Sequence, residues 1–226
     1  MPDLTLIIGN KNYSSWSLRP WLFMRHFGLD FTERRVALFT DTTERELAPW
    51  FSDGKVPILL DGDLVVWDSL AILEYLSERH LNGRGWPTDS GARAMARAIS
   101  AEMHSSFGQV RSELPMNCRR RFRDVPLSAA ALREIERVKA IWCRCRTDHG
   151  RDGDWLCGQF SIADAMYAPV ALRFFGYTVA LDGIAAAYVD TVLADPHVRA
   201  WMAAGETEAE VIAEDELDHP SYRSGD

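Results

Sequence analysis

The clearest pattern of apolar and polar positions lies within residues 54–76, GKVPILLDGDLVVWDSLAILEYL. Two short β-rich apolar runs, 58–60 and 64–67, flank the Asp61-Gly62 turn signal, and this arrangement predicts a β-hairpin. Leucines then recur at helical spacing behind Asp68-Ser69, so we expect a helix that begins at this pair. The stretch therefore predicts strand, turn, strand and helix in immediate succession.

Two residue pairs in this stretch are candidates for ligand binding. Val56-Pro57 ends a loop at the start of the first strand, where a cis peptide bond would turn a backbone edge outward. Asp68-Ser69 places a carboxylate and free backbone N–H groups at a helix N-terminus, which suits an anion. Each pair also has a plainer interpretation, as a trans turn and as ordinary helix capping.

Strands and helices alternate through residues 1–80. Pro20 fits only the first turn of a helix, which sets the start of the first helix close to Ser17, and Gly28 is its expected end. The order β-α-β-α-β-β-α implies a parallel core sheet to which the hairpin adds an antiparallel edge. The elements expected before the hairpin are a strand at 4–8, a helix at 18–27, a strand within 31–38 and a short helix within 42–51.

The remainder of the chain reads as helical. Residues 81–88 (LNGRGWPT) are rich in Gly and end in Pro-Thr, so we expect a linker there and a second, all-helical domain over 89–226. Apolar residues recur every three or four positions from Ala92 to Leu114, which predicts one long helix ended by Pro115. The further helices expected are one behind Ser128, one behind a Ser161-x-x-Asp164 capping box and kinked or broken at Pro169, and two at 184–193 and 196–204.

Composition and charge narrow the class of protein. The 226 residues are 47% hydrophobic and 26% charged, as in a globular protein, and no run approaches the length of a membrane span. The net charge of −8 is concentrated in residues 206–218, which hold seven acids and no Lys or Arg, so the rest is near neutral and nucleic-acid binding is not expected. The start shows no signal-peptide pattern, and we expect a cytoplasmic protein with its four cysteines reduced, no metal site and a frayed end at 218–226.

Ser14-Ser15 is the remaining chemical candidate. The pair lies between a turn-rich loop at 9–13 and a helix start, where a hydroxyl can point at a ligand or simply cap the helix. No G-x-S-x-G motif and no Ser-His-Asp set accompanies it, and a serine without a base is better suited to donating a hydrogen bond than to attacking. From the residues alone, the sequence predicts two domains and an anion-friendly site at their junction.

The order of these motifs resembles that of the cytosolic glutathione transferases. Val56-Pro57 before the third strand, an acid-Ser pair opening the last helix of the first half, and S-x-x-D in the helical half follow the family pattern across essentially the whole chain. The resemblance implies a thioredoxin-like domain that binds glutathione as co-substrate and a helical domain that lines the pocket for a small electrophile. It also implies a homodimer that serves detoxification.

Residues 14–19, SSWSLR, are similar to the S-S-C-S-W-R stretch of the zeta class, which includes maleylacetoacetate isomerases. The match implies that Ser14 donates a hydrogen bond to the glutathione sulfur and so favours thiolate over thiol, with Ser15 as the neighbouring alternative. Trp16 stands where the zeta pattern has cysteine. With tryptophan in place of this cysteine, the resemblance supports glutathione binding more strongly than it supports the isomerase's thiol-assisted chemistry.

The resemblance also implies a set of glutathione-binding residues. Val56, held by a cis Pro57, would pair its backbone with the cysteinyl backbone of glutathione. Asp68 and Ser69 would hold the ammonium and the carboxylate of the γ-glutamyl end, and Lys55 would reach the glycyl carboxylate.

The pocket for the second substrate is less defined by sequence. Its expected residues are Trp16, His104, Phe107 and Arg111, while Arg173 lies about one helical turn short of the position expected for a zeta substrate arginine. Three functions remain open: a glutathione transferase, a maleylacetoacetate-type cis-trans isomerase, and a non-catalytic transferase-like module that binds proteins or carries apolar ligands.

Overall fold

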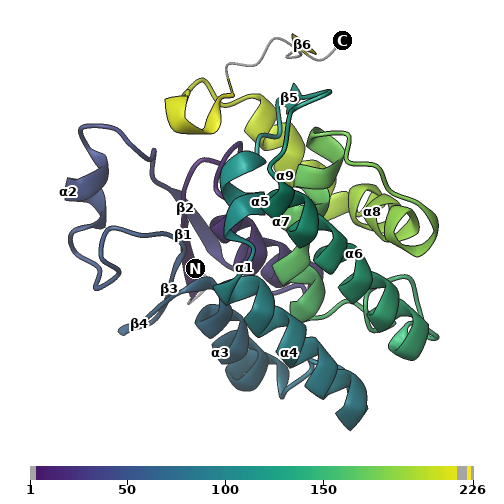
Figure 1. Cartoon of the computed structure of the whole chain (residues 1–226). Coiled ribbons are helices and arrows are strands. Elements are labelled where there is room, and N and C mark those ends of the chain that lie inside the picture. Colours follow the sequence, from purple (N-terminus) through teal and green to yellow (C-terminus); the bar gives the residue numbers. More distant parts are fainter. Residues whose placement is uncertain (1–3, 218–222, 225–226) are drawn as a thin grey trace.

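The computed structural model describes residues 4–217 and 223–224 (Figure 1). A small sheet with its helices forms one side of the molecule, and a larger group of helices forms the other (Figure 1). The helix α1 (Ser15–His26) packs on α3 (Ser69–Leu81) of the first half and on α7 (Ile162–Gly176) of the second. Because α1 begins at the expected serine pair, this packing brings both halves of the chain to one place.

The sheet has the strand order β2-β1-β3-β4. Its strands are β1 (Leu4–Ile8), β2 (Thr32–Arg35), β3 (Ile58–Asp61) and β4 (Leu64–Trp67). Strands β1 and β2 are parallel, whereas β3 pairs antiparallel with both β1 and β4. The mixed sheet and the hairpin are confirmed, although the hairpin supplies half of the sheet and, of its two strands, β4 is at an edge while β3 is interior.

Alternating side chains of the strands cover two faces. Leu6 and Ile8 belong to the main core with α1 and α3, while Ile7 and Ile58 face the other way. There they pack with Leu47 of α2 (Thr43–Leu47), which lies on the opposite side of the sheet from α1 in Figure 1. The short α2 is therefore the cover of the second face.

Helix α1 begins two residues earlier than expected. The structure corrects the placement of Pro20 in the first turn, because Pro20 lies inside a helix that starts at Ser15. The Ser14 side chain accepts a hydrogen bond from the Ser17 N–H at 3.4 Å and caps the helix. Burial of nearly the whole helix between the two halves maintains it past the proline, whose missing N–H would otherwise weaken it.

The second half is helical, as expected. Its helices are α4 (Ser90–Ser105), α5 (Gly108–Glu113), α6 (Ala129–His149), α7, α8 (Gly183–Ala194) and α9 (Pro196–Glu206). Helix α7 continues through Pro169, so the early break that was expected as an alternative to a kink is absent. The helix is buried almost all round, and packing compensates for the missing N–H. The capping box of Ser161 and Asp164 is present.

The single helix expected from Ala92 to Leu114 is wrong. Ser106 is extended and Phe107 has a left-handed backbone with a φ of 62°, so α4 and α5 are separate. The Phe107 side chain is buried in the core at 4% exposure. Because a periodic apolar pattern does not record a local change in direction, the break was invisible in the sequence.

The chain after α9 crosses back towards the sheet as a segment that includes the 3-10 turn Ala213–Asp215. The pair Arg223–Ser224 forms β6 and pairs antiparallel with β5 (Arg120–Arg121). The expected fraying at 218–226 otherwise falls on residues 218–222 and 225–226, which lie outside the described residues. Within the described chain, no helix combines the length and apolar character needed to cross a membrane.

Candidate functional site

Two adjoining cavities lie where the sheet domain meets the helical half. We name the first the Asp68 cavity and the second the serine cavity; their volumes are about 510 and 590 Å³. Both are lined by Trp16, Lys55 and Val56, which places them side by side around one tryptophan. The Asp68 cavity adds Ser52, Pro57, Trp67, Asp68, Ser69 and His104. The serine cavity adds Ser14, Ser15, Arg111 and Arg173, together with Tyr13, Ile212 and Asp215.

The loop before β3 presents a backbone edge to both cavities. The Val56–Pro57 peptide bond is cis, as expected. Within the described residues the N–H and C=O of Val56 have no hydrogen-bond partner. An unpaired donor and acceptor on one residue can pair with an extended backbone laid alongside it.

Asp68 caps α3 and also faces the helical half. It has a φ of 73°, and its Oδ1 accepts hydrogen bonds from the N–H groups of Leu70 at 2.9 Å and Ala71 at 3.2 Å. Its Oδ2 lies 2.6 Å from His104 Nε2 on α4. The buried Ser69 hydroxyl accepts a hydrogen bond from Arg19 Nη1 at 3.4 Å. The helix start thus offers an acid together with the Ser69 hydroxyl and the positive end of the helix dipole, which suits a zwitterion.

The two serines have different hydrogen-bond environments. The Ser14 hydroxyl donates to Ser17 Oγ at 2.7 Å while its oxygen caps α1. The Ser15 oxygen accepts a hydrogen bond from Arg173 Nη2 at 3.1 Å. In the described part of the chain no acceptor faces the Ser15 O–H, so its proton is available to a ligand in the serine cavity.

Buried guanidinium groups surround Trp16. The Arg19 guanidinium lies 4.1 Å and that of Arg111 5.0 Å from the Trp16 ring centroid. Burial, with the nearby charges of Arg111 and Arg173, lowers the pKa of Arg19 to about 9, and burial lowers that of Arg173 to about 10. Both stay protonated at neutral pH, and because Arg173 lines the serine cavity together with Arg111, that part of the cavity wall is cationic.

Arg173 ties the site to the helical half. Besides Ser15, it donates to the carbonyl oxygens of Arg111, at 3.2 Å, and Leu114. The sequence analysis set it one turn short of a substrate position. The structure brings it to the serine pair, because α7 packs directly on α1.

The structure brings most of the expected site residues together. Lys55 is at the cavity rim, exposed and paired with Asp53 at 2.9 Å. Phe107 is the exception: it packs in the core and lines neither cavity. No group of His, Cys, Asp or Glu side chains suited to a metal ion occurs among residues 4–217.

Beyond the expected residues, the serine cavity is lined by Tyr13, by Ile212 and Asp215, and by a set from the segment between β2 and β3: Leu38, Phe39, Thr40, Thr43, Glu44 and Gly54. Tyr13 precedes the serines, and its hydroxyl donates to Glu216, while burial and this carboxylate raise the pKa of Tyr13. Ile212 and Asp215 come from the acidic C-terminal segment. The density of acids there was the only signal in the sequence, and it did not indicate where the segment packs.

Family comparisons agree with this geometry. The model described as "Glutathione S-transferase, N-terminal domain" matches residues 13–79, and "Glutathione S-transferase, C-terminal domain" matches residues 101–204. The two matches cover more than half of the chain. The chain belongs to the glutathione transferase family, with the small mixed sheet and the helical second half of that fold.

Individual relatives match more narrowly. A dichloromethane dehalogenase of Methylophilus leisingeri is 39% identical over 69 residues, which cover 28% of this chain and 25% of that protein. A probable maleylacetoacetate isomerase of Caenorhabditis elegans is 35% identical over 90 residues, covering 40% of this chain and 41% of that protein. The matches thus span between about a quarter and two-fifths of these curated relatives.

A solved structure matches over nearly the whole length. A Burkholderia glutathione transferase homolog, determined with bound glutathione, superimposes with a TM-score of 0.68 at 23% identity. The match covers 92% of this chain and 100% of that one. At this identity the likeness establishes the fold.

Proposed function

We propose that the protein is a glutathione transferase that joins the glutathione sulfur to small electrophiles. The observation that carries this proposal is the convergence of Val56, Asp68, Ser69 and the serine pair on two adjoining cavities. Glutathione would lie in the Asp68 cavity, its γ-glutamyl ammonium on Asp68 and its carboxylate on the Ser69 hydroxyl and the α3 N-terminus. Its cysteinyl backbone would pair with Val56, and Lys55 would reach the glycyl carboxylate.

We propose that a serine hydroxyl stabilises the thiolate. The sequence put Ser14 first, but its proton is engaged by Ser17 at 2.7 Å. Ser15 has a free proton and receives a hydrogen bond from the cationic Arg173, which strengthens Ser15 as a donor. We therefore favour Ser15 as the donor to sulfur and keep Ser14 as the alternative.

The proposed attack follows from this geometry. A hydrogen bond to sulfur favours the thiolate and lowers the pKa of the bound thiol, and the thiolate is the nucleophile. The carbon of the electrophile, held in the serine cavity, receives the sulfur electron pair and loses its leaving group. Trp16, which lines both cavities, would lie between the two substrates, and Arg111 would line the electrophile side. His104 approaches Trp16 edge-on at 5.6 Å between ring centroids.

Binding and conjugation are tested together. Calorimetry with glutathione at millimolar concentration is expected to show binding, and an aryl halide such as chlorodinitrobenzene is expected to be conjugated. The Ser15→Ala variant should raise the pKa of the bound thiol, followed by thiolate absorbance, by about 1–2 units. A larger shift in Ser14→Ala would return the role to Ser14, and equal, unshifted values in both variants would remove serine from the mechanism.

The isomerase is a second candidate, because a stretch of 90 residues is 35% identical to a probable maleylacetoacetate isomerase. Trp16 stands in place of the zeta-class cysteine, so thiol-assisted isomerisation would need another group. A direct assay on maleylacetoacetate separates the two activities. Calorimetry without any heat from glutathione would instead favour the non-catalytic module.

We also propose a cytoplasmic homodimer with a role in detoxification. The four cysteines are unpaired, and Cys118, Cys145 and Cys157 are buried, as suits a reducing compartment. Phe51 is 82% and Trp67 44% exposed, and their rings meet edge to face at 5.3 Å. An exposed aromatic pair of this kind suits a contact with a second copy of the chain.

A further inference from the structure

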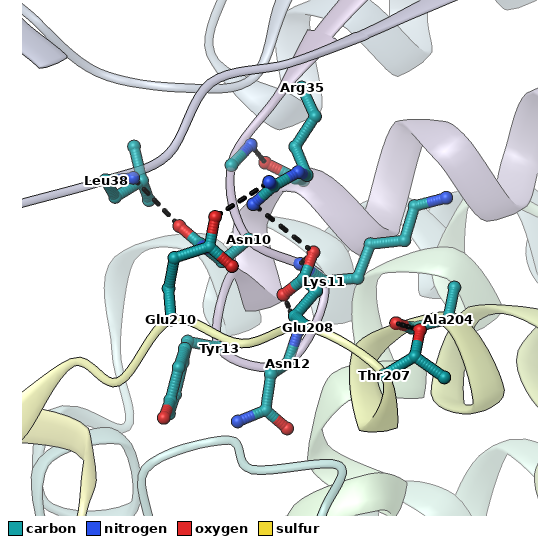
Figure 2. Close-up of polar contacts among 12 residues, drawn as sticks. Asn10, Lys11, Asn12, Tyr13, Arg35, Leu38, Ala204, Thr207, Glu208 and Glu210 are labelled. Atoms are coloured by element: carbon teal, nitrogen blue, oxygen red, sulfur yellow. Dashed lines mark hydrogen bonds and ion pairs between the residues drawn. The ribbon is translucent and has the colours of Figure 1, made fainter. Parts of the chain in front are cut away.

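The acidic C-terminal segment, which we name the strap (residues 207–217), lies across the turn that leads into α1. Figure 2 shows Glu208 and Glu210 between Arg35 of β2 and the turn formed by Asn10, Lys11 and Asn12. Neither Lys nor Arg interrupts its acids. The proposed chemistry assigns no role to this segment.

Carboxylates fasten the first part of the strap. The two oxygens of Glu208 accept hydrogen bonds from the N–H groups of Lys11 at 2.8 Å and Asn12 at 3.0 Å (Figure 2). Arg35 pairs with Glu210 at 2.7 Å and with Glu208 at 3.7 Å (Figure 2). These contacts fix the strap to the turn immediately before Ser14.

Arg119, in the connection between α5 and β5, fastens the strap from the helical half. It donates to the carbonyl oxygens of Glu208 at 2.6 Å and Glu210 at 2.9 Å, and to the Tyr13 hydroxyl at 2.6 Å. Because Arg119 binds strap backbone as well as Tyr13, it links the strap to the residue preceding the serine pair.

The far end of the strap is held by a second set of contacts. Glu216 pairs with Arg120 at 2.7 Å and accepts hydrogen bonds from Tyr13 and from Asn117. Leu217 packs on a small apolar cluster of the helical half, which consists of Leu114, Phe122 and Tyr177. The strap is therefore anchored at both ends, at residues 208–210 and at residues 216–217, with Ile212 between them.

The middle of the strap forms part of the serine cavity. Ile212 is only 3% exposed and lines the cavity, as does Asp215, whereas the neighbouring Val211 is 65% exposed. The Ile212 side chain thus forms one wall of a cavity whose other walls come from residues 13–16, from the segment 38–56 between β2 and β3, and from Arg111 and Arg173.

We propose that the strap determines electrophile specificity: Ile212 sets the size of the group that the serine cavity accepts, and Arg119 is the positioning residue that holds Ile212 there. This inference rests on the proposed function, since it concerns the second substrate of that same site. Glutathione itself would touch the Asp68 cavity, which the strap does not line. The strap should therefore change electrophile selectivity without changing affinity for glutathione.

Alanine substitutions at two neighbouring residues test whether the Ile212 side chain limits the size of the electrophile. The ratio of kcat/KM for para-phenylbenzyl chloride to that for benzyl chloride is measured with Ile212→Ala and with Val211→Ala. We expect Ile212→Ala to raise the ratio by at least about 10-fold, because a misfit of one methylene at an apolar wall already has about this effect and the substitution removes three carbons. The Val211→Ala ratio and the KM for glutathione in both variants should match the wild type. Equal ratios in the two variants would overturn the size-selecting role.

A second pair tests the positioning residue through a readout independent of catalysis. Amide hydrogen exchange of residues 207–217 is followed in Arg119→Gln and in Arg123→Gln, whose side chain is exposed. Arg119→Gln should speed exchange in the strap and shift selectivity in the direction of Ile212→Ala, while Arg123→Gln should do neither. Unchanged exchange in Arg119→Gln would overturn its positioning role. If the wild type conjugated neither chloride, the proposed function and the size-selecting role of Ile212 would both be overturned. Slow amide exchange in the strap of that same protein would leave the anchoring by Arg119 intact.

Discussion

Asp68 caps a helix and also lines the cavity in which we propose that glutathione binds. One carboxylate oxygen caps α3 through the N–H groups of Leu70 and Ala71, and the other lies 2.6 Å from His104. Capping requires only an acceptor, whereas holding an ammonium group requires a charge. The two functions can therefore be separated by a substitution that keeps the oxygen and removes the charge.

Asp68→Asn is expected to retain the cap and to weaken glutathione binding. Loss of a charge-assisted hydrogen bond, about 1.5–3 kcal/mol, predicts a KM for glutathione about 10- to 100-fold higher with the melting temperature nearly unchanged. Steady-state kinetics and thermal unfolding measure both quantities. Asp89→Asn is the matched control, because Asp89 caps α4 through Ala92 at 2.8 Å outside both cavities. A KM that rises equally in both variants would contradict the assignment.

At the scale of elements, α7 is the central helix of the second half. It packs on α1, α4 and α8, and its first turn contains a fully buried acid, Asp164. The carboxylate accepts hydrogen bonds from the N–H groups of Ser161 and Leu156, each at 2.9 Å, and from the Tyr188 hydroxyl at 3.2 Å. Burial outweighs these bonds and raises the pKa of Asp164 to about 6.

This pKa predicts how stability depends on pH. A carboxyl group with a raised pKa binds its proton more tightly in the folded chain, so its contribution is complete below the unfolded value of 3.8 and is lost as pH rises through about 6. The free energy of unfolding of the wild type, relative to that of Asp164→Asn, should fall by on the order of 2–3 kcal/mol over this range. Urea titrations at a series of pH values measure the difference.

The control for this prediction has the opposite sign. Backbone hydrogen bonds, chiefly from Ala92, lower the pKa of the exposed Asp89, so its contribution appears as pH rises above its folded pKa. Relative to Asp89→Asn, the wild type should gain stability over the acidic range. A flat difference for Asp164→Asn would show that burial and hydrogen bonding cancel at this site.

At the scale of the whole molecule, the two halves share one hydrophobic core. The main cluster runs from Leu6 and Leu22 of the sheet domain to Met166 and Trp201 of the helical half. The cavities lie at this junction, so the relative position of the halves sets the site. Phe51 and Trp67, in contrast, remain exposed, and Trp67 also lines the Asp68 cavity.

The exposed aromatic pair leads to a prediction about assembly. The wild type is expected to sediment at twice the 25.5 kDa of the chain, and Phe51→Ser is expected to shift it towards the monomer because the exposed ring supplies apolar area at the contact. Leu132→Ser on α6, where Leu132 is 51% exposed, is the control and should leave the mass unchanged. Analytical ultracentrifugation measures the mass, and a monomeric wild type would rule out the proposed dimer.

Several features could be predicted from short stretches of sequence. The hairpin followed from Asp61-Gly62 between two apolar runs, and the start of α3 followed from Asp68-Ser69. The capping box of α7 followed from Ser161 and Asp164. These features depend on interactions within a few residues, so the local sequence contains the information that specifies them.

The tertiary structure decided the features that depend on distant partners. The break between α4 and α5 coincides with burial of the Phe107 ring in the core. Ser15 differs from Ser14 because its oxygen accepts a hydrogen bond from Arg173, 158 positions further along the chain. The strap reaches the Lys11 N–H across 197 positions. Sequence by itself determined most of the elements, the capped start of α3 and the unusual charge of the C-terminal segment. Only folding decided which serine proton is free and which wall the acids hold in place, because those outcomes depend on packing between α1, α7 and the strap.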